Sequence, residues 1–391
     1  MIVNTCAFLE AAREEAIDAI LDAAAYKKQR CRLLIVAGCL PMRYLDDVRG
    51  ELPEVDLWLL PDRYADAGRL IGEALGVADV GQKAVSRLLT TPPHYAYLKI
   101  ADGCNNRCTF CMIPSIRGAY RSESPDALVT EAKALVIGGV KELILVAQDT
   151  TRYGSDRQSY GTLAELIPKL TAIEGLETVR LLYCYPERIT DELIDVIASD
   201  AKVAPYLDIP MQHASDRILH RMNRRSTRRS LLDLIAKLRS RIPKLAIRTT
   251  MMIGFPGETE EDVDSLCNFL EEAQLDRVGF FTYSKEEDTP SALLDGQVSE
   301  DEKQARLYRV AAVQQAIAFK KAADSIGKTI RVRYEDVDYD RGLFIGRPLT
   351  SAPDLDPVVY FSADYAEIGE NYDVKVTAAD GYDLIAVKEN V

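Results

Sequence analysis

The chain has 391 residues, of which 47% are hydrophobic and 28% are charged, and its formal net charge is -13 at pH 7. This balance excludes an intrinsically disordered chain, and the length favours two or three domains. The start lacks the basic and apolar regions of a secretory signal, and no apolar run approaches the ~18 residues of a transmembrane helix. We therefore expect a cytoplasmic protein with no membrane partner. The negative charge disfavours phosphate backbones and favours basic protein partners.

Residues 1–80 are predicted to form a small α/β domain. Its expected elements are an amphipathic helix, an apolar strand and a turn, at residues 10–25, 32–37 and 38–39. The chain opens on Ile2 and Val3, which look like the last residues of a strand, so we expect an N-terminally truncated domain. Residues 81–94 carry polar residues and prolines and are predicted to be a linker.

Residues 95–326 alternate short apolar runs with longer amphipathic stretches. The six predicted strands lie near residues 96–100, 142–147, 179–184, 205–209, 246–253 and 277–282. Strands alternating with helices pair in parallel, which favours a partial (β/α)6 barrel, although a doubly wound sheet fits the same pattern. In either architecture, functional residues belong at the C-terminal ends of the strands. Gly138 and Gly139 are expected to end a helix.

Residues 327–391 change to short alternating strands, which predict a small β-barrel after a long helix that ends near residue 326. The expected strands are at residues 330–334, 358–361 and 372–378. This segment contains seven basic and thirteen acidic residues, so its net charge is 7 - 13 = -6. A barrel that binds nucleic acid should be basic, whereas an acidic one suits a basic protein partner.

Cys104, Cys108 and Cys111 form a C-x3-C-x2-C loop directly after the first strand of the central domain. In a reducing compartment, clustered thiols indicate metal or redox chemistry rather than disulfides. Three thiolates can hold an iron–sulfur cube and leave its fourth iron open to a small molecule. The alternative is a zinc site, which needs a remote fourth ligand such as His94 or His213.

This spacing, with the aromatic Phe110 before the last cysteine, resembles the signature of the radical S-adenosylmethionine (SAM) superfamily. The resemblance implies a 4Fe-4S cluster at Cys104, Cys108 and Cys111 as the catalytic and metal-binding centre. In that family the open iron chelates the amino and carboxylate groups of SAM, and one-electron reduction releases a 5'-deoxyadenosyl radical. A flavodoxin or ferredoxin is the electron donor that the resemblance implies.

Further segments are similar to the methylthiotransferases of this superfamily: LVAQDTTRYG, LLYCYPERITDELI, DIPMQHASDRIL, TTMMIGFPGETEED and FTYSKEEDTP. The sequences of these motifs resemble the RimO type, which modifies the β-carbon of an aspartate in small-subunit ribosomal protein twelve. The tail resembles a TRAM domain. The alternatives are a transfer-RNA adenosine methylthiotransferase of the MiaB type, and a cluster-binding protein without sulfur transfer.

Several residues are candidate cofactor contacts because they follow predicted strands: Gln148, Asp149, Arg188, Gly254, Phe255, Pro256 and Gly257. Similar loops in the family line the SAM pocket, and an arginine fork can pair with a carboxylate of cofactor or substrate. Strand-end capping, a surface ion pair and a plain strand-to-helix turn explain the same residues. His213 is placed for a substrate pocket, but a lone histidine is more often structural.

Cys6 and Cys39 each follow a strand of the first domain, so both thiols should lie on one rim. The family resemblance implies a second, auxiliary 4Fe-4S cluster there, held by three cysteines, of which these match the second and third. The first should precede Met1, so either the start is placed too late, or the chain is shortened, or Cys31 substitutes. Cys31 is more easily explained as a buried thiol.

The remaining candidates are interpreted as structural. Cys184 and Cys267 lie in apolar patterns and are predicted to be core residues. Six arginines between positions 217 and 229 are expected to form a solvated helix face, with a contact to ribosomal RNA as the alternative.

Overall fold

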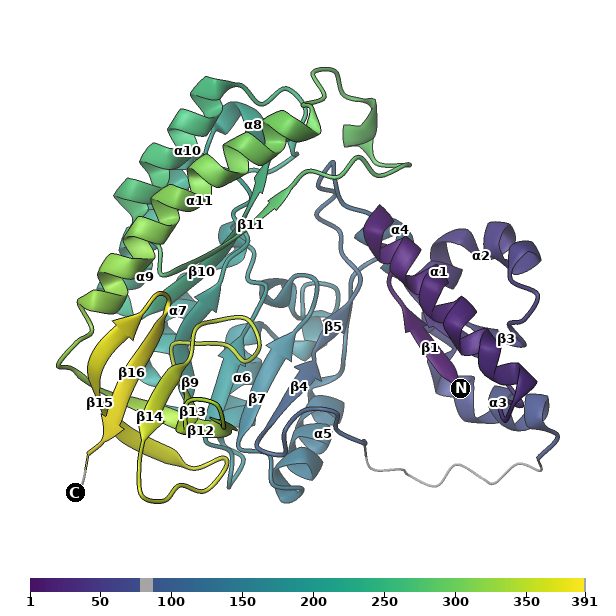
Figure 1. The fold of residues 1–391 in the computed structure, drawn as a ribbon, viewed down its shortest axis with the longest axis horizontal. Helices are drawn as coiled ribbons and strands as arrows, with labels where there is room; N and C mark the ends of the chain where they lie inside the picture. Colours follow the sequence, from purple (N-terminus) through teal and green to yellow (C-terminus); the bar gives the residue numbers. More distant parts are fainter. Residues whose placement is uncertain (78–86, 390–391) are drawn as a thin grey trace. The chain divides into compact units, whose positions relative to one another are not determined.

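The computed structural model describes residues 1–77 and 87–389, which group into two compact units (Figure 1). Unit 1 comprises Met1–Arg87, Gly103–Ala119 and Ser284–Leu293, and unit 2 comprises Leu88–Asp102, Tyr120–Tyr283 and Leu294–Val391. The predicted linker lies partly outside the described residues, and residues 87–94 contain neither helix nor strand. The units cross the boundaries that we predicted, because the cysteine loop and residues 284–293 group with the N-terminal segment.

Unit 1 contains a three-stranded parallel sheet in the order β1-β2-β3. Its elements are β1 (Ile2–Thr5), α1 (Glu10–Ala25), η1 (Tyr26–Lys28), β2 (Ile35–Gly38), α2 (Cys39–Glu51), β3 (Leu57–Leu59), η2 (Pro61–Asp66), α3 (Ala67–Leu75), α4 (Ile113–Arg117) and η6 (Pro290–Leu293). The predicted helix at 10–25 is confirmed. The predicted turn is wrong at Cys39, which is the first residue of α2. Gly38 makes the sharp entry, with φ 102° and an added Cβ only 2.2 Å from the Thr5 carbonyl oxygen.

Unit 2 is built on a six-stranded sheet in the order β11-β10-β9-β8-β7-β4, with every neighbouring pair parallel. The strands are β4 (Tyr95–Lys99), β7 (Glu142–Val146), β8 (Thr178–Leu181), β9 (Val203–Asp208), β10 (Ala246–Ile253) and β11 (Arg277–Thr282). All six predicted strands are confirmed. A two-stranded ribbon, β5 (Ala101–Asp102) and β6 (Arg121–Ser122), flanks the cysteine loop in the chain.

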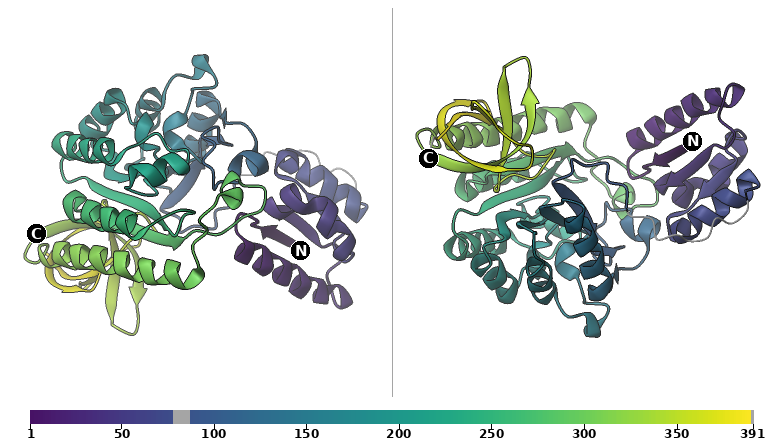
Figure 2. Two further views of the ribbon diagram at one scale, coloured as in Figure 1. Left: turned by 90° about the horizontal axis from the view of Figure 1, so that it is seen from above. Right: turned by 90° about the horizontal axis from the view of Figure 1, so that it is seen from below.

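The helices of unit 2 pack on one face of this sheet, as the views of Figure 2 show. They are α5 (Pro125–Ile137), α6 (Leu163–Thr171), α7 (Asp191–Ser199), α8 (Asp216–Arg221), α9 (Arg228–Arg241), α10 (Glu260–Ala273) and α11 (Glu300–Ala323), with short turns η3 (Thr150–Arg152), η4 (Gln158–Tyr160) and η5 (Pro186–Arg188). Gly138 caps the end of α5, as predicted. One-sided packing distinguishes a partial barrel from a doubly wound sheet, so the barrel is the observed architecture. Within residues 1–77 and 87–389, no helix is long and apolar enough to cross a lipid bilayer.

The C-terminal segment closes into a five-stranded barrel in the order β12-β13-β14-β16-β15. Its strands are β12 (Thr329–Asp338), β13 (Leu343–Pro348), β14 (Val359–Ser362), β15 (Asn371–Asp380) and β16 (Asp383–Lys388). Three match the predicted strands, and the other two were not predicted. Val332, Phe361 and Val374 lie in its buried core, which confirms the small β-barrel.

The small barrel is fixed to the partial barrel by a buried ion network. Glu142 of β7 is 0% exposed, and its carboxylate accepts hydrogen bonds from Arg180 Nε at 2.7 Å and Arg347 Nη2 at 2.6 Å. Arg347, on β13, also donates to Glu335 of β12 at 2.9 Å. Ala352, in the loop after β13, packs with inward-facing residues of the six-stranded sheet. The two barrels therefore share buried charge and apolar surface.

Candidate active site

The three-cysteine loop is an irregular segment between β5 and α4. Cys104 is 9% exposed, and Cys108 and Cys111 are half-buried. The Cys104 amide donates to the Gly118 carbonyl at 3.2 Å, and the Cys111 amide donates to the Cys108 carbonyl at 3.1 Å. The Asn106 amide points at Cys104 Sγ, at 3.5 Å. Backbone N–H groups directed at a thiolate stabilise its negative charge, as cluster ligands require.

The loop does not form a site for a single metal ion. Among residues 1–77 and 87–389, no three His, Cys, Asp or Glu side chains are gathered closely enough to hold one ion. Zinc needs all four ligands within about 2.3 Å of one centre, whereas a four-iron cube takes three thiolates on three different irons. The donor set therefore fits the cluster better than zinc.

The two histidines considered as zinc ligands are each engaged elsewhere. His94 Nε2 lies 3.0 Å from the Glu335 carboxylate. His213 is 0% exposed, and its Nδ1 accepts from the Ser215 amide at 2.9 Å, so Nε2 carries the proton and donates to Glu258 at 3.3 Å. The substrate-pocket interpretation of His213 is therefore replaced by a structural one.

Gly103 precedes the first cysteine and allows the two arms of the loop to meet. Its φ is 78°, and an added Cβ would lie 2.4 Å from the Ala119 carbonyl oxygen. We expect Gly103→Ala to destabilise the loop by about 1–3 kcal/mol, because the neighbouring atoms are backbone. Iron content after anaerobic reconstitution measures the effect. Gly76→Ala is the control, since Gly76 has φ 67° with open space around it; equal iron retention in both variants would contradict the prediction.

Gln148 and Asp149 follow β7 and differ in their surroundings. Gln148 Oε1 is buried without a hydrogen-bond partner among the described residues, so it offers an acceptor to a ligand amine. The Asp149 carboxylate accepts from Thr151 Oγ1 at 2.6 Å and lies 3.5 Å from Arg188 Nε. The structure thus brings Asp149 and Arg188 together. Their charges are paired with each other, and the arginine is 36% exposed.

The loop of residues 254–257 is held from several sides. Gly254 has φ 74°, and its amide donates to Glu258 Oε2 at 3.0 Å. Arg306 also donates to this carboxylate, at 3.2 Å. The Phe255 ring is 0% exposed and packs edge-on against Tyr283 at 5.4 Å. Our expectation for the Phe255 side chain is therefore corrected: the ring belongs to the core and supports the turn.

The next residues are packed as well. Pro256 is buried, and its carbonyl accepts from Arg221 Nε at 3.1 Å. Gly257 has φ 82°, with the same guanidinium about 3.0 Å from where a Cβ would lie. Glycine is required at this position by that close approach.

Cys6 and Cys39 meet at the same edge of the unit 1 sheet. Thr5 pairs with Gly38 in the parallel register of β1 and β2, so the two cysteines follow neighbouring positions. Cys6 is exposed and Cys39 is half-buried. Arg117 of α4 donates from Nη2 to Cys39 Sγ at 3.6 Å. The two cysteines therefore follow the same edge of the sheet, and a guanidinium lies beside Cys39.

Cys31 lies at the opposite end of β2. Its Sγ lies 3.4 Å from the Leu33 carbonyl oxygen and 4.0 Å from the Met1 amino group. Because Cys39 follows the C-terminal end of the same strand, Cys31 is excluded as a third ligand beside Cys6 and Cys39.

Two residues at the C-terminal edge of the unit 2 sheet were missed by sequence reasoning. Tyr183 and Gln212 have positive φ angles of 56° and 75°, and Tyr183 is 44% exposed. Such strain in residues other than glycine clusters at functional sites. Gln212 Oε1 is also buried without a partner within the described residues. Nothing in the sequence pattern signals these backbone conformations.

The arginines at 217–229 are largely paired with acidic or aromatic neighbours. Arg217 contacts Asp262, and Arg228 contacts Glu272 at 2.7 Å. Arg224 is only 7% exposed and stacks on Tyr185 at 4.1 Å. Arg224 therefore does not lie on a solvated face.

Cys184 and Cys267 are buried, as predicted. Burial raises the pKa of both thiols, which keeps them protonated. They therefore resemble core residues rather than ligands.

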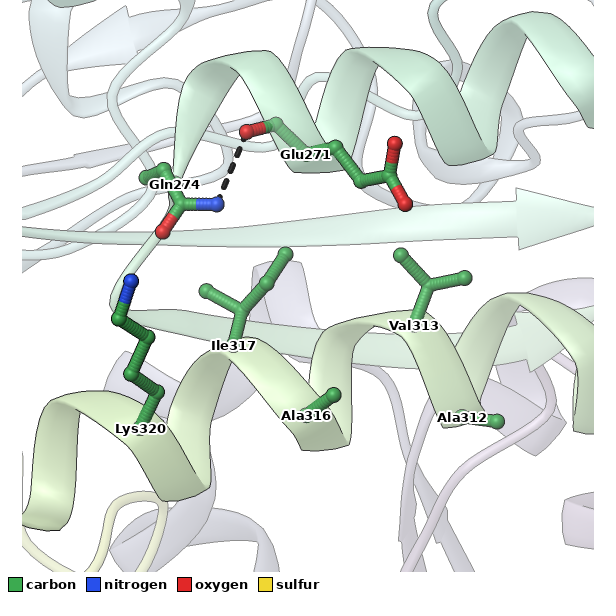
Figure 3. A pocket seen from close by; sticks show the side chains of 7 residues that line it. All are labelled: Glu271, Gln274, Ala312, Val313, Ala316, Ile317 and Lys320. Atoms are coloured by element: carbon green, nitrogen blue, oxygen red, sulfur yellow. Dashed lines mark hydrogen bonds between the residues drawn. The ribbon is translucent and has the colours of Figure 1, made fainter.

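A hollow between α10 and α11 lies away from the strand ends (Figure 3). It is lined by Ala312, Val313, Ala316 and Ile317 of α11, facing Glu271 and Gln274. Gln274 Nε2 donates a hydrogen bond to the Glu271 carbonyl at 2.8 Å, at the C-terminal end of α10. Lys320 of α11 completes the lining, and the hollow is a helix-packing groove.

Comparison with solved structures identifies the fold. The radical SAM methyltransferase TsrM from Kitasatospora setae, in a structure with cobalamin and a [4Fe-4S] cluster, has a TM-score of 0.55 and 14% identity over 75% of this chain and 65% of that chain. A second TsrM structure, with tryptophan and a SAM analogue, has a TM-score of 0.52 and 14% identity over 69% of this chain; this chain spans 58% of its length.

Sequence comparisons define the family. The model of the radical SAM superfamily matches residues 98–270, that of the TRAM domain matches 326–388, and that of the uncharacterized protein family UPF0004 matches 1–59. Proteins described as ribosomal protein uS12 methylthiotransferase RimO from Lachnoclostridium phytofermentans and Geobacter sulfurreducens are 46% and 45% identical, over 100% and 98% of this chain and 91% and 89% of theirs. The chain therefore belongs to the RimO family of radical SAM methylthiotransferases.

Proposed function

We propose that this chain is a radical SAM enzyme that adds a methylthio group to the β-carbon of an aspartate in ribosomal protein uS12. The observation that carries the proposal is 46% identity along the whole chain to a protein named as a uS12 methylthiotransferase. The MiaB-type and non-catalytic alternatives are not favoured by any of the relatives described above.

Cys104, Cys108 and Cys111 are the proposed ligands of the 4Fe-4S cluster. When bound, this cluster and SAM supply a carbon radical that can take hydrogen from an unactivated carbon. The loop contributes three thiolates and the Asn106 amide directed at Cys104 Sγ. Its closure by Gly103 holds the thiolates in a fixed arrangement before the cofactor binds.

Gln148 is the proposed acceptor for the SAM amino group, because its buried Oε1 otherwise lacks a donor among the described residues. Asp149 and Arg188 are proposed to act together. Asp149 orients the guanidinium, whose exposed side remains available to a carboxylate. For residues 254–257, we propose that the backbone of Gly254 and Gly257 approaches the cofactor, while Glu258 fixes the turn.

Cys6 and Cys39 are the proposed ligands of an auxiliary 4Fe-4S cluster. Their support is the register that places both at one edge of the sheet, and the Arg117 guanidinium that faces Cys39. A third cysteine at this rim is not found within the described part of unit 1.

The small barrel supports a protein substrate over RNA. Its net charge is -6, and two of its seven basic residues, Arg333 and Arg347, are buried in ion pairs with Glu177 and Glu142. Glu335 and Asp356 of the barrel are also buried in ion pairs, so these buried charges offset one another and the charge presented to a partner stays negative. An acidic surface attracts a basic ribosomal protein and repels phosphate. Three further expectations remain predictions. They are a contact between Arg225 and ribosomal RNA, a cytoplasmic location, and electron donation by a flavodoxin or ferredoxin.

The test is anaerobic reconstitution with iron, sulfide, SAM and dithionite, followed by incubation with uS12 or with transfer RNA. We expect mass spectrometry to find one methylthio group on an aspartate of uS12 and none on adenosine. Modification of transfer RNA alone would overturn the proposal. Binding of SAM without release of 5'-deoxyadenosine would support the cluster-binding alternative.

A further inference from the structure

Residues 284–293 follow β11 in the chain but group with unit 1. Within this segment Glu286 is 3% exposed, although it is charged. Its Oε1 accepts from the Glu10 amide at 3.0 Å and from Ser284 Oγ at 2.8 Å. Its Oε2 lies 3.4 Å from Arg43 Nη1. One buried carboxylate therefore joins the start of α1 to α2.

Both partners are linked in sequence to the candidate auxiliary ligands. Glu10 comes four residues after Cys6, and Arg43 comes four residues after Cys39. Residues four apart lie on the same face of a helix, so Arg43 and Cys39 share a face of α2. Arg43 also donates to the Ala7 carbonyl at 3.1 Å, directly after Cys6. Glu286 and Arg43 thus connect the two cysteine-bearing segments.

Charge gives this connection its strength. Arg13 and Arg43 both lie over the Tyr44 ring, at 5.0 and 4.8 Å from its centroid, and both face Glu286. The Arg43 side chain is only 5% exposed, so loss of the carboxylate would leave a buried cation poorly compensated.

The other end of the segment reaches the three-cysteine loop. The Ser291 amide donates to the carbonyl of Thr109 at 3.0 Å, and Ser291 is 0% exposed. Thr109 follows Cys108 directly. Thr289 links the two ends, because its hydroxyl donates to the Glu286 carbonyl at 2.7 Å and lies 3.1 Å from Ser291 Oγ.

We infer that Glu286 is a positioning residue that holds the Cys6 and Cys39 segments at a fixed distance from the Cys104–Cys108–Cys111 loop. The inference rests on the proposed function for the chemical role of these cysteines. Radical formation uses the three-cysteine loop, whereas sulfur transfer requires both sites in register. A displacement of about 1 Å at a reacting centre can cost about 100-fold in rate.

The experiment compares Glu286→Gln with Glu287→Gln, its neighbour whose side chain is exposed. With uS12 present, we expect Glu286→Gln to lower methylthiolation about 100-fold while 5'-deoxyadenosine release stays near that of the unsubstituted protein. The amount of 5'-deoxyadenosine released per methylthio group added should therefore rise in Glu286→Gln and stay unchanged in Glu287→Gln. A purely structural defect would lower both products in parallel, and that result would overturn the inference.

A second readout is independent of cluster loading. Hydrogen exchange of the protein without iron should accelerate at the amides of α1 near Glu10 and in the loop near Thr109 in Glu286→Gln, and remain unchanged in Glu287→Gln. Equal exchange in the two variants would overturn the inference. Arg43→Lys keeps the positive charge but loses the planar guanidinium. It should therefore change the product ratio and the hydrogen exchange in the same direction as Glu286→Gln, but by a smaller amount.

If the unsubstituted protein releases 5'-deoxyadenosine without modifying uS12, the proposed function fails. Hydrogen exchange then still decides whether Glu286 connects the segments.

Discussion

Cys108→Ala will abolish 5'-deoxyadenosine release from SAM under reducing, anaerobic conditions. The substitution removes one of the three proposed thiolate ligands, and water or a distant side chain cannot replace a thiolate on iron. Loss of outer-shell partners alone costs about 10- to 100-fold in metal affinity or activity, so loss of a ligand should exceed about 100-fold. Chromatography of the nucleoside product measures the rate, and electron paramagnetic resonance of the reduced protein reports the cluster.

Cys31→Ala is the matched control for this prediction. Cys31 is also half-buried in unit 1, but it lies at the opposite end of β2 from Cys39 and away from the three-cysteine loop in sequence. It should retain both the product and the spectroscopic signal. If Cys108→Ala released 5'-deoxyadenosine as fast as Cys31→Ala, the loop would not be the site of SAM cleavage.

Glu142→Gln will destabilise unit 2 by about 3–5 kcal/mol, the range observed when one member of a buried ion pair is removed. Arg180 is 0% exposed and Arg347 is almost fully buried, and both donate to this carboxylate. Gln cannot balance their charge. The shift of the urea unfolding midpoint measures the loss, and Glu174→Gln, at an exposed position, should change stability by less than about 0.5 kcal/mol.

We also expect the effect of Glu142→Gln on stability to depend on pH. Burial opposes ionisation of Glu142, but the charges of Arg347 and Arg180 outweigh it and hold the pKa of this carboxyl well below its ordinary value of 4.5. The folded-state pKa is thus below the unfolded one, so the stabilisation is complete above about pH 4.5 and is lost as the pH falls further. The stability difference between the unsubstituted protein and Glu142→Gln should therefore narrow in acid. A difference that stayed constant from about pH 6 to about pH 3 would contradict this account.

The stability of this network also bears on function. Arg347 belongs to the small barrel and Glu142 to the partial barrel, so the acidic surface proposed to attract uS12 is anchored to the catalytic domain by a buried contact. A partner held on that surface would be presented at a defined orientation rather than on a flexible tether.

The sequence by itself determined the periodic elements and the cysteine cluster that is close in the chain. The helix at 10–25, all six parallel strands and the C-x3-C-x2-C loop were predictable, because apolar periodicity and short spacing are local properties. Strands β13 and β16 escaped prediction because they are half-buried along most of their length, so their apolar alternation is weak.

Only the tertiary structure decided which residues act together. It assigned Phe255 to the core, paired Asp149 with Arg188, and excluded Cys31 from the rim of Cys6 and Cys39. It also revealed Glu286, which looks in sequence like one of several acidic residues in an exposed loop. Such contacts join positions up to 276 residues apart, and side-chain partners at that separation follow from the packing of whole elements rather than from any local pattern.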